Sequence, residues 1–172
     1  LKTYLAPSLA RWRGFRLLYE PGYQTGDFTD HPEPDRRTIA EGFGVIMRDS
    51  IEPYLEPGVT PLLAAALFSE DRFGRCPAIA AADTMALAER LTVLEARLAW
   101  FEQYLALLIP PIFESLFHHG VVFEPHLQNV VVCIRKGYPV QVFVRDLEGT
   151  KLVPGRWPGE LPDTLDEQTL AS

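Results

Sequence analysis

The stretch HGVVFEPHLQNVVVCIRKGYPVQVFVRDLEG, residues 119–149, decides the fold of this 172-residue chain. Residues 129–134 are mostly β-branched, and residues 140–145 alternate apolar and polar side chains, so both segments predict strands. The turn-forming residues 135–139 lie between them and predict an antiparallel hairpin. Gly120 marks the point where helical spacing gives way to strand spacing.

Upstream of the hairpin, large apolar side chains recur at helical spacing, which predicts a helix packed on the core through that stripe. The stripe consists of Leu87, Leu91, Leu94, Leu98, Phe101, Leu105 and Leu108. Asp83 or Thr84 is the expected N-cap. Pro110 and Pro111 predict a break or kink, followed by a second helical run that ends at Gly120. The predicted fold class is α+β, with this kinked helical pair packed on a mainly antiparallel sheet.

The remainder of the chain has weaker patterns. Residues 21–37 are polar and rich in glycine and proline, so we expect a long loop. Residues 45–48 fit a short buried strand or a helix, and residues 59–69 fit a short helix or strand, whereas residues 78–83 resemble a loop. We expect a single domain over residues 1–172. Its divisions are a variable portion (1–80), the helices with the hairpin (81–150) and a polar tail (151–172).

Composition excludes several classes of protein. A net charge of −7, from 16 basic and 23 acidic residues, argues against a nucleic-acid binder, which carries a basic stripe. Every apolar stretch is shorter than the about 20 residues that cross a bilayer, so we expect no membrane partner. The two cysteines, Cys76 and Cys133, have no close partner in sequence and are expected as free thiols, which favours a cytoplasmic location.

Polar side chains lie at the start of the first predicted strand and at the end of the second. Glu124 and His126 precede the first strand and Asn129 begins it, whereas Arg145 ends the second strand and Asp146 follows it. Because a hairpin returns its last residue beside its first, Asn129 and Asp146 are expected to lie together. Carboxylate and amide oxygens are ligands that magnesium takes alongside phosphate oxygens. His126 can donate to a phosphate or a carboxylate, and Arg145 can neutralise an anion.

This order of features is remotely like a protein kinase core: a loop ending in asparagine, a hairpin, then an aspartate before a glycine. Glu124-Pro125-His126 stands where a kinase has His-Arg-Asp, and no activation-loop signature follows. A Walker-type phosphate loop is also missing from the sequence. We therefore expect a hairpin-borne nucleotide and metal site of remotely kinase-like geometry, and no protein kinase.

The pattern His-Gly-(x)3-Glu-x-His-x-Gln-Asn, followed by Arg-Asp-x-x-Gly, closely resembles a known family. It is similar to the C-terminal, palm-like catalytic region of the aerobactin-type siderophore synthetases that work without a peptide-synthetase assembly line, a region also grouped with ferric iron reductase-like domains. The likeness covers most of the chain and is strongest over residues 94–150. Pro125 stands where the family commonly has alanine. The family's Ser-x-Arg-Thr element, which holds the triphosphate, has no match here, so we expect the C-terminal part of a longer synthetase.

The resemblance implies siderophore biosynthesis with ATP and Mg²⁺: adenylation of citrate or a citryl intermediate, then attack by an amine, hydroxylamine or alcohol. The implied partners are thus a citrate-class carboxylate and a polyamine, hydroxylamine or alcohol, and a homodimer is left open. Implied cofactor-binding residues are His119, Glu124, His126, Gln128, Asn129 and Asp146. Implied metal ligands are Glu124, Asn129, Asp146 and Glu148. Implied catalytic residues are His126 and Arg145, and implied substrate-binding residues are Arg48 and His126.

Three alternatives stay open at this stage. His119, Glu124 and His126 fit a two-histidine, one-carboxylate iron site. A second alternative is a non-catalytic domain that binds an iron–siderophore. A reductase of this grouping is not expected, because it needs a cysteine cluster that the sequence lacks. The simplest alternative is structural: a polar loop with turn caps, a surface ion pair at Arg145 and Asp146, and histidines that favour a helix C-terminus.

Overall fold

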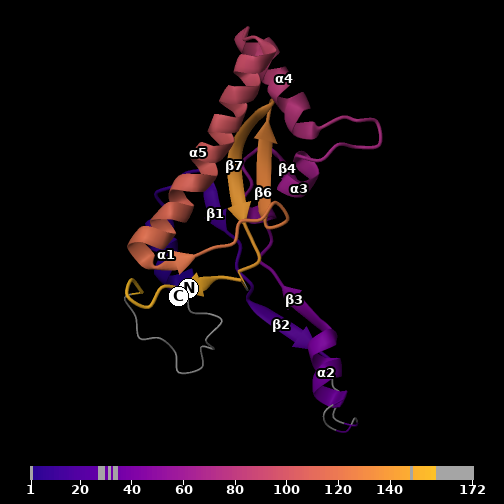
Figure 1. Cartoon of the computed structure of the whole chain (residues 1–172), viewed down its shortest axis with the longest axis vertical. Coiled ribbons are helices and arrows are strands. Elements are labelled where there is room, and N and C mark those ends of the chain that lie inside the picture. The colour runs from indigo at the N-terminus through magenta and orange to yellow at the C-terminus, as the bar shows by residue number, and fades with distance from the viewer. Residues whose placement is uncertain (1, 27–29, 31, 33–34, 148, 158–172) are drawn as a thin grey trace.

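A mixed four-stranded sheet forms the centre of the computed structural model (Figure 1). The structure describes residues 2–26, 30, 32, 35–147 and 149–157. The strand order is β1-β7-β6-β4. β6 (Val130–Arg135) and β7 (Tyr138–Val144) are the predicted hairpin, and β4 (Thr60–Leu63) pairs antiparallel with β6. β1 (Phe15–Leu17) pairs parallel with β7. The predicted combination of helices with a mainly antiparallel sheet is confirmed.

A two-residue turn closes the hairpin. Lys136 and Gly137 both have positive φ, 52° and 89°, as hairpin turns of this length favour. The Nε1 of Trp100 donates to the Gly137 carbonyl oxygen at 2.9 Å. A Cβ built on Gly137 would lie 2.8 Å from the carbonyl oxygen of Ala81. The turn therefore sits directly against the helices that cover the sheet.

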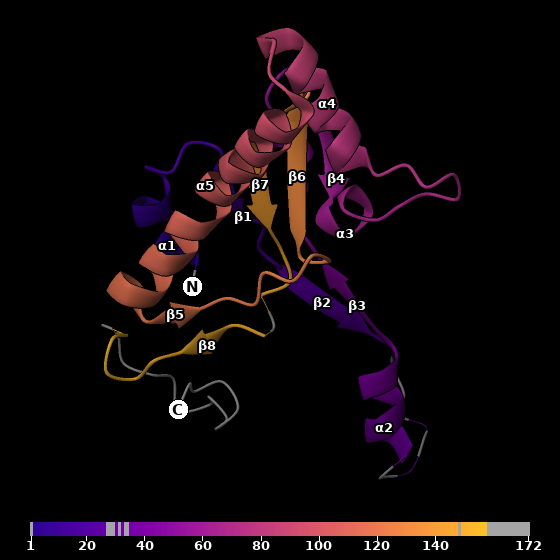
Figure 2. The same cartoon turned by 45° about the horizontal axis from the view of Figure 1, so that its top comes forward.

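Two helices, α4 (Pro77–Glu89) and α5 (Val93–His119), pack together over the hairpin (Figure 2). The loop expected at residues 78–83 is wrong, because Pro77 starts α4 and the alanines that follow are strong helix formers. The N-cap expected at Asp83 or Thr84 is also wrong. The chain turns at Arg90, whose φ is 57°, and Thr92 begins α5 through a capping box with Glu95.

The predicted break at Pro110 and Pro111 is absent, because α5 runs through both prolines to His119. Tyr104 and Leu108 precede the prolines, Ser115 follows them, and all three side chains are buried. Packing on both sides thus holds the helix together where two backbone donors are missing. Gly120 ends the helix with φ of 65°, as predicted.

The leucine stripe expected in the core is wrong over most of its length. Leu87 is 85% exposed, Leu94 68% and Leu98 56%, and only Leu108 is fully buried. α5 instead packs on the sheet through a face that shares only Leu108 with the predicted stripe. Its buried residues include Ala96, Trp100, Tyr104, Leu108, Pro111 and Ser115. Helical spacing identified an apolar face correctly, but this helix has two such faces.

The N-terminal segments contribute a helix to the core and a ribbon that projects from it. α1 (Lys2–Leu9) places Leu5 and Leu9 in the main core. β2 (Gly22–Thr25) and β3 (Gly44–Met47) form an antiparallel ribbon that projects from the body with α2 (Asp35–Gly42) at its tip (Figures 1 and 2). The polar loop expected over residues 21–37 thus contains β2 and the start of α2. β3 is exposed throughout, so the buried strand expected there is wrong.

Short elements complete the architecture: the 3₁₀ turn η1 (Glu52–Tyr54), the helix α3 (Ala64–Leu67), and the paired strands β5 (Val121–Val122) and β8 (Lys151–Leu152). The segment expected as a polar tail from residue 151 begins with β8, and residues 158–172 lie outside the described part. None of the described helices is long and apolar enough to span a membrane.

Both cysteines are free, as expected. Cys133 is fully buried in β6, and this burial raises the pKa of its thiol to about 11.

Candidate functional site

Asn129 and Asp146 flank the open end of the hairpin. Asn129 directly precedes β6, and Arg145, directly after β7, donates its backbone N–H to the Asn129 carbonyl oxygen at 2.9 Å. The Nδ2 of Asn129, a residue only 8% exposed, donates to the Glu124 carbonyl oxygen at 3.4 Å. This bond commits the amide nitrogen, so Oδ1 is the atom that can accept a hydrogen bond or bind a cation.

The 124–129 loop is held by its own backbone. The N–H of His126 donates to the carbonyl oxygen of Glu124 at 2.8 Å, and that of Asn129 to the carbonyl oxygen of His126 at 2.7 Å. The Nε2 of His126 lies 3.6 Å from the Oε2 of Glu124, and both side chains remain open to solvent. A Cβ on Gly149 would lie 2.7 Å from that same Glu124 oxygen. The segment after β7 therefore folds back onto the loop.

Asp146 pairs with Arg48. Their Oδ2 and NH2 atoms are 3.1 Å apart, and the Nε of Arg48 donates to Glu20 Oε1 at 2.8 Å. The hydrogen bond to Glu20, followed by the charge of Asp146, raises the pKa of the Arg48 guanidinium against the opposing effect of burial. Arg48 thus lies beside the hairpin end, although nearly a hundred residues of sequence separate it from Asp146.

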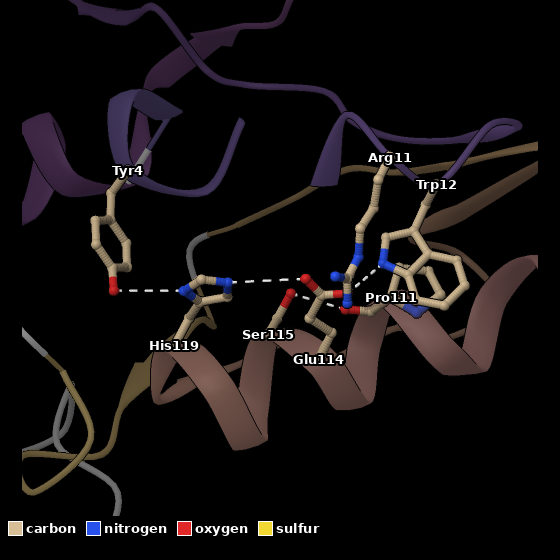
Figure 3. Close-up of polar contacts among 7 residues, drawn as sticks. All are labelled: Tyr4, Arg11, Trp12, Pro111, Glu114, Ser115 and His119. Carbon is tan, nitrogen blue, oxygen red and sulfur yellow. Dashed lines mark hydrogen bonds and ion pairs between the residues drawn. The ribbon is translucent and has the colours of Figure 1, made fainter. Parts of the chain in front are cut away.

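The remaining predicted residues are placed differently. Arg145 donates from Nε and NH2 to the Gln128 carbonyl oxygen at 3.3 and 3.1 Å, which ties the end of β7 to the loop. Glu148 lies outside the described residues. His119 is not directed at the loop: its Nε2 is 3.9 Å from Glu114 Oε1, and its Nδ1 is 3.4 Å from the Tyr4 hydroxyl (Figure 3).

Within the described ranges, no three or more His, Cys, Asp or Glu side chains gather where they could hold a metal ion. The alternative iron site of His119, Glu124 and His126 is therefore not assembled there. The predicted set of Glu124, Asn129 and Asp146 counts an amide among its ligands, and in this structure its two carboxylates lie beside Arg48 and His126. Two carboxylates and an amide oxygen are hard oxygen donors, and with a histidine beside them they suit magnesium together with phosphate.

One polar group that the sequence reasoning did not assign is Glu114. Its carboxylate is buried in α5 and accepts hydrogen bonds from Arg11, with NH2 at 2.5 Å, and from the indole nitrogen of Trp12 (Figure 3). The available signal was an acid inside the apolar run of residues 112–117. The spacing alone could not show which distant residues would satisfy it.

Known proteins resemble both the sequence and the fold. Residues 98–171 match the family model described as ferric iron reductase FhuF-like transporter. The N(2)-citryl-N(6)-acetyl-N(6)-hydroxylysine synthase of Vibrio mimicus is 30% identical over 148 residues, which is 85% of this chain and 23% of that protein. The spermidine-citrate ligase of Bacillus anthracis is 28% identical over 155 residues, or 87% of this chain and 23% of the ligase.

Among solved structures, aerobactin synthetase IucA from a hypervirulent pathotype of Klebsiella pneumoniae has a TM-score of 0.72 at 22% identity, covering 88% of this chain and 26% of that one. IucC from the same source has a TM-score of 0.66 at 24% identity, covering 97% and 28%. These structures define the class of fold: the α+β architecture that also occurs in siderophore synthetases.

The sequence matches add the family. The predicted resemblance is confirmed: over most of its length the chain is similar to part of the siderophore synthetases that work without a peptide-synthetase assembly line. It spans about a quarter of the length of the curated relatives it matches.

Proposed function

We propose that this chain forms the nucleotide- and metal-handling part of an ATP-dependent ligase of siderophore biosynthesis. The ligase condenses citrate or a citryl intermediate with an amine, hydroxylamine or alcohol through an acyl-adenylate. The observation that carries this proposal is the bonded end of the hairpin, where Asn129 binds the Glu124 carbonyl oxygen and the backbone N–H of Arg145, the neighbour of Asp146. The similar proteins are named as a citryl-hydroxylysine synthase and a spermidine-citrate ligase.

In this proposal Glu124, Asn129, Asp146 and Glu148 bind Mg²⁺ through oxygen atoms. His126, Gln128 and Asn129 hold the nucleotide, and His126 also faces the carboxylate substrate. Bound ATP with magnesium supplies an activated leaving group for the carboxylate. Arg145 braces the loop through Gln128, so its contribution is to fix the loop that carries His126. A structure of ATP-bound IucA shares this fold at a TM-score of 0.72, which supports nucleotide use.

Two of the proposed roles change once the geometry is considered. Arg48 neutralises Asp146 in this structure, so we propose that it moves to a substrate carboxylate when a cation takes its place. His119 contacts Glu114 and Tyr4 instead of the loop, so any effect of His119 on nucleotide binding is transmitted through the end of α5.

The test is ATP binding by the chain and by Asp146→Asn, followed by calorimetry and thermal melts with and without Mg²⁺. We expect ATP with Mg²⁺ to raise the Tm of the unmodified chain, because a ligand that binds only the folded state stabilises it. Asp146→Asn should abolish this rise. Without ligand its Tm should change little or increase, because a partly exposed ion pair contributes only about 0–1 kcal/mol.

Asp83→Asn is the matched control, since Asp83 is also a partly exposed aspartate in an arginine pair, here with Arg97. It should keep the full ligand response. If ATP with Mg²⁺ binds neither protein, or binds Asp146→Asn as tightly as the unmodified chain, the hairpin end is not the nucleotide site. A large loss of Tm in ligand-free Asp146→Asn would instead identify Asp146 as a structural partner of Arg48.

A further inference from the structure

The outer side of α5 carries a row of large apolar side chains, here called the outer row. It consists of Phe101, Leu105, Ile109, Phe113 and Phe117, spaced four residues apart. α5 covers the hairpin with one side, and its other side faces outward (Figures 1 and 2). The exposed fractions are 47% at Phe101, 37% at Ile109, 50% at Phe113 and 56% at Phe117.

Charged side chains are missing from the outer side of α5 over four helical turns. Between residues 103 and 117 the only charged residue is Glu114, and its side chain is buried against Arg11 and Trp12. A helix at the surface of a soluble protein normally has charged or polar residues on the side that faces water. The outer row is therefore typical of a helix side that contacts protein.

The size of the outer row fits a weak protein–protein interface. An aromatic side chain has about 150–250 Å² of surface to bury, so the three half-exposed phenylalanines alone leave roughly 300 Å² open. Ile109 and the exposed Ala106 extend this patch. Weak complexes bury less than about 1,200 Å² in total, or about 600 Å² per partner. A patch of this size therefore supports a complex that dissociates on dilution.

The two ends of the outer row carry opposite charges. Glu102 is exposed beside Phe101. At the other end, the NH1 of Arg156 donates to the Phe117 carbonyl oxygen at 3.0 Å, and its guanidinium carbon lies 5.7 Å from the centre of the Phe117 ring. A Cβ built on Gly120 would lie 2.7 Å from the Cβ of Arg156, so the end of α5 fixes this residue. Among the described residues, neither Glu102 nor Arg156 has an oppositely charged partner.

This arrangement of charges is self-complementary under a two-fold axis. Glu102 lies seven residues before Ile109, and Phe117, which carries Arg156, lies eight residues after it. A second copy whose α5 runs antiparallel therefore brings Glu102 of each copy to the same end of the contact as Arg156 of the other. A parallel pair would bring like charges together. A surface for an unrelated protein needs no such symmetry, whereas a two-fold homodimer uses the same surface on both copies.

We propose that two copies of this chain associate through the outer row, with the two α5 helices antiparallel and Ile109 at the two-fold axis. Rows of side chains four residues apart pack into the grooves between the same rows of a second helix. One Glu102–Arg156 ion pair forms at each end of the contact. The residues proposed to bind nucleotide and metal are not part of the outer row, so this association is independent of the proposed ligase activity.

Sedimentation equilibrium of the 172-residue chain tests the proposal. We expect a reversible monomer–dimer equilibrium at protein concentrations up to about 0.1 mM, as suits an interface of this size. Ile109→Asp should raise the Kd of the dimer at least about a hundredfold, because it places two like charges together at the axis. Leu94→Asp is the matched control. Leu94 is 68% exposed on the same helix but lies outside the outer row, so this change should leave the Kd unaltered.

Glu102→Arg and Arg156→Glu test the antiparallel arrangement. Each variant alone places like charges at both ends of the contact, so its dimer should be about three- to tenfold weaker. Mixed in equal amounts, the two variants should form a heterodimer as tight as the unmodified dimer, because both ends then join opposite charges. Both substitutions change exposed side chains, so this experiment decides the proposal even if Ile109→Asp alters the circular dichroism spectrum.

Several outcomes would overturn the proposal. The first is a chain that sediments as a monomer at about 0.1 mM, which would leave the outer row to a different protein or to solvent. Others are a folded Ile109→Asp variant that still dimerises, or a Leu94→Asp variant that is weakened as much as Ile109→Asp. Failure of the mixed charge variants to associate better than either one alone would exclude the antiparallel contact.

Discussion

Glu114 is a carboxylate on the face of α5 that otherwise buries apolar side chains. It is satisfied from outside the helix, by Arg11 and Trp12, and it therefore couples the start of the chain to α5. A buried acceptor that serves two donors contributes more to stability than an exposed charge does, because removing it leaves those donors without a partner.

We expect Glu114→Gln to lower the free energy of unfolding by about 1–3 kcal/mol, because a neutral amide oxygen accepts more weakly than a carboxylate from the Arg11 and Trp12 donors. Glu102→Gln, an exposed change on the same helix, should alter it by less than about 0.5 kcal/mol. Urea unfolding followed by tryptophan fluorescence measures both. Equal effects would show that the Glu114 bonds add nothing to stability.

Cys133 gives a pH prediction. Burial raises the pKa of its thiol from 9.0 to about 11, so at alkaline pH the unfolded chain releases this proton before the folded chain does. The stabilisation is complete below pH 9 and is lost as the pH rises towards 11. Unfolding titrations across this range should show a steeper decline for the unmodified protein than for Cys133→Ala; parallel curves would exclude a contribution from this thiol.

At this scale the sequence predicted part of the candidate site. Asn129 and Asp146 were placed together because the alternation in 140–145 fixes a local hairpin, and a hairpin joins its own ends. Arg48 was predicted as a site residue only through the family resemblance, because nothing in the local sequence specifies that β3 ends beside Asp146. His119 was grouped with the loop by proximity in sequence, but Gly120 turns the chain after it and leaves its ring against Tyr4.

Among the elements, the hairpin and α5 depend on each other at the turn. Gly137 has a positive φ, and its carbonyl oxygen accepts from Trp100 while its Cα lies against α4. Gly58 also has a positive φ, 74°, but a Cβ there would meet nothing within 4 Å. Comparing Gly137 with Gly58 therefore separates the cost of a positive φ from the cost of close packing.

We expect Gly58→Ala to cost about 1 kcal/mol of unfolding free energy from the left-handed conformation alone. Gly137→Ala should cost at least about 2 kcal/mol, because the added methyl group also presses on the Ala81 carbonyl oxygen. Thermal or urea unfolding of both variants decides this. Equal costs would mean that the turn moves freely away from α4.

The helices show why element boundaries were harder to predict than element types. Residues 78–83 are nearly all small, so they lack the apolar stripe by which a helix is recognised, yet they form the first half of α4. β1 and β4 have only three and four residues, and their pairing with β7 and β6 comes from distant parts of the chain. Short strands of this kind carry little signal in a window of local sequence.

Across the whole molecule, the outer face of α5 and the end of α4 expose a run of large apolar side chains. Leu98 is 56% exposed and Leu108, on the same helix, only 5%. In this chain the stripe therefore contributes little to the stability of the fold. Apolar periodicity showed that this face avoids polar residues, but not whether anything in the chain packs against it.

We expect Leu98→Gln to change the free energy of unfolding by less than about 0.5 kcal/mol in dilute solution. Leu108→Gln should lower it by at least about 3 kcal/mol, since it buries an amide and loses core packing. Sedimentation of both variants accompanies the unfolding curves. A large cost for Leu98→Gln that depends on protein concentration would show that a second copy covers the stripe.

The parallel pairing of β1 with β7 has a consequence for the order in which the molecule assembles. Phe15 pairs with Val142, so all of the chain between these two residues must be synthesised before β1 finds its neighbour, and closing so long a loop slows folding. The β6–β7 hairpin joins neighbouring segments of the chain and can form quickly by itself. The first strand and α1 would then wait with apolar side chains such as Leu5 and Phe15 exposed, and during translation this early segment is where chaperone binding or aggregation is most expected.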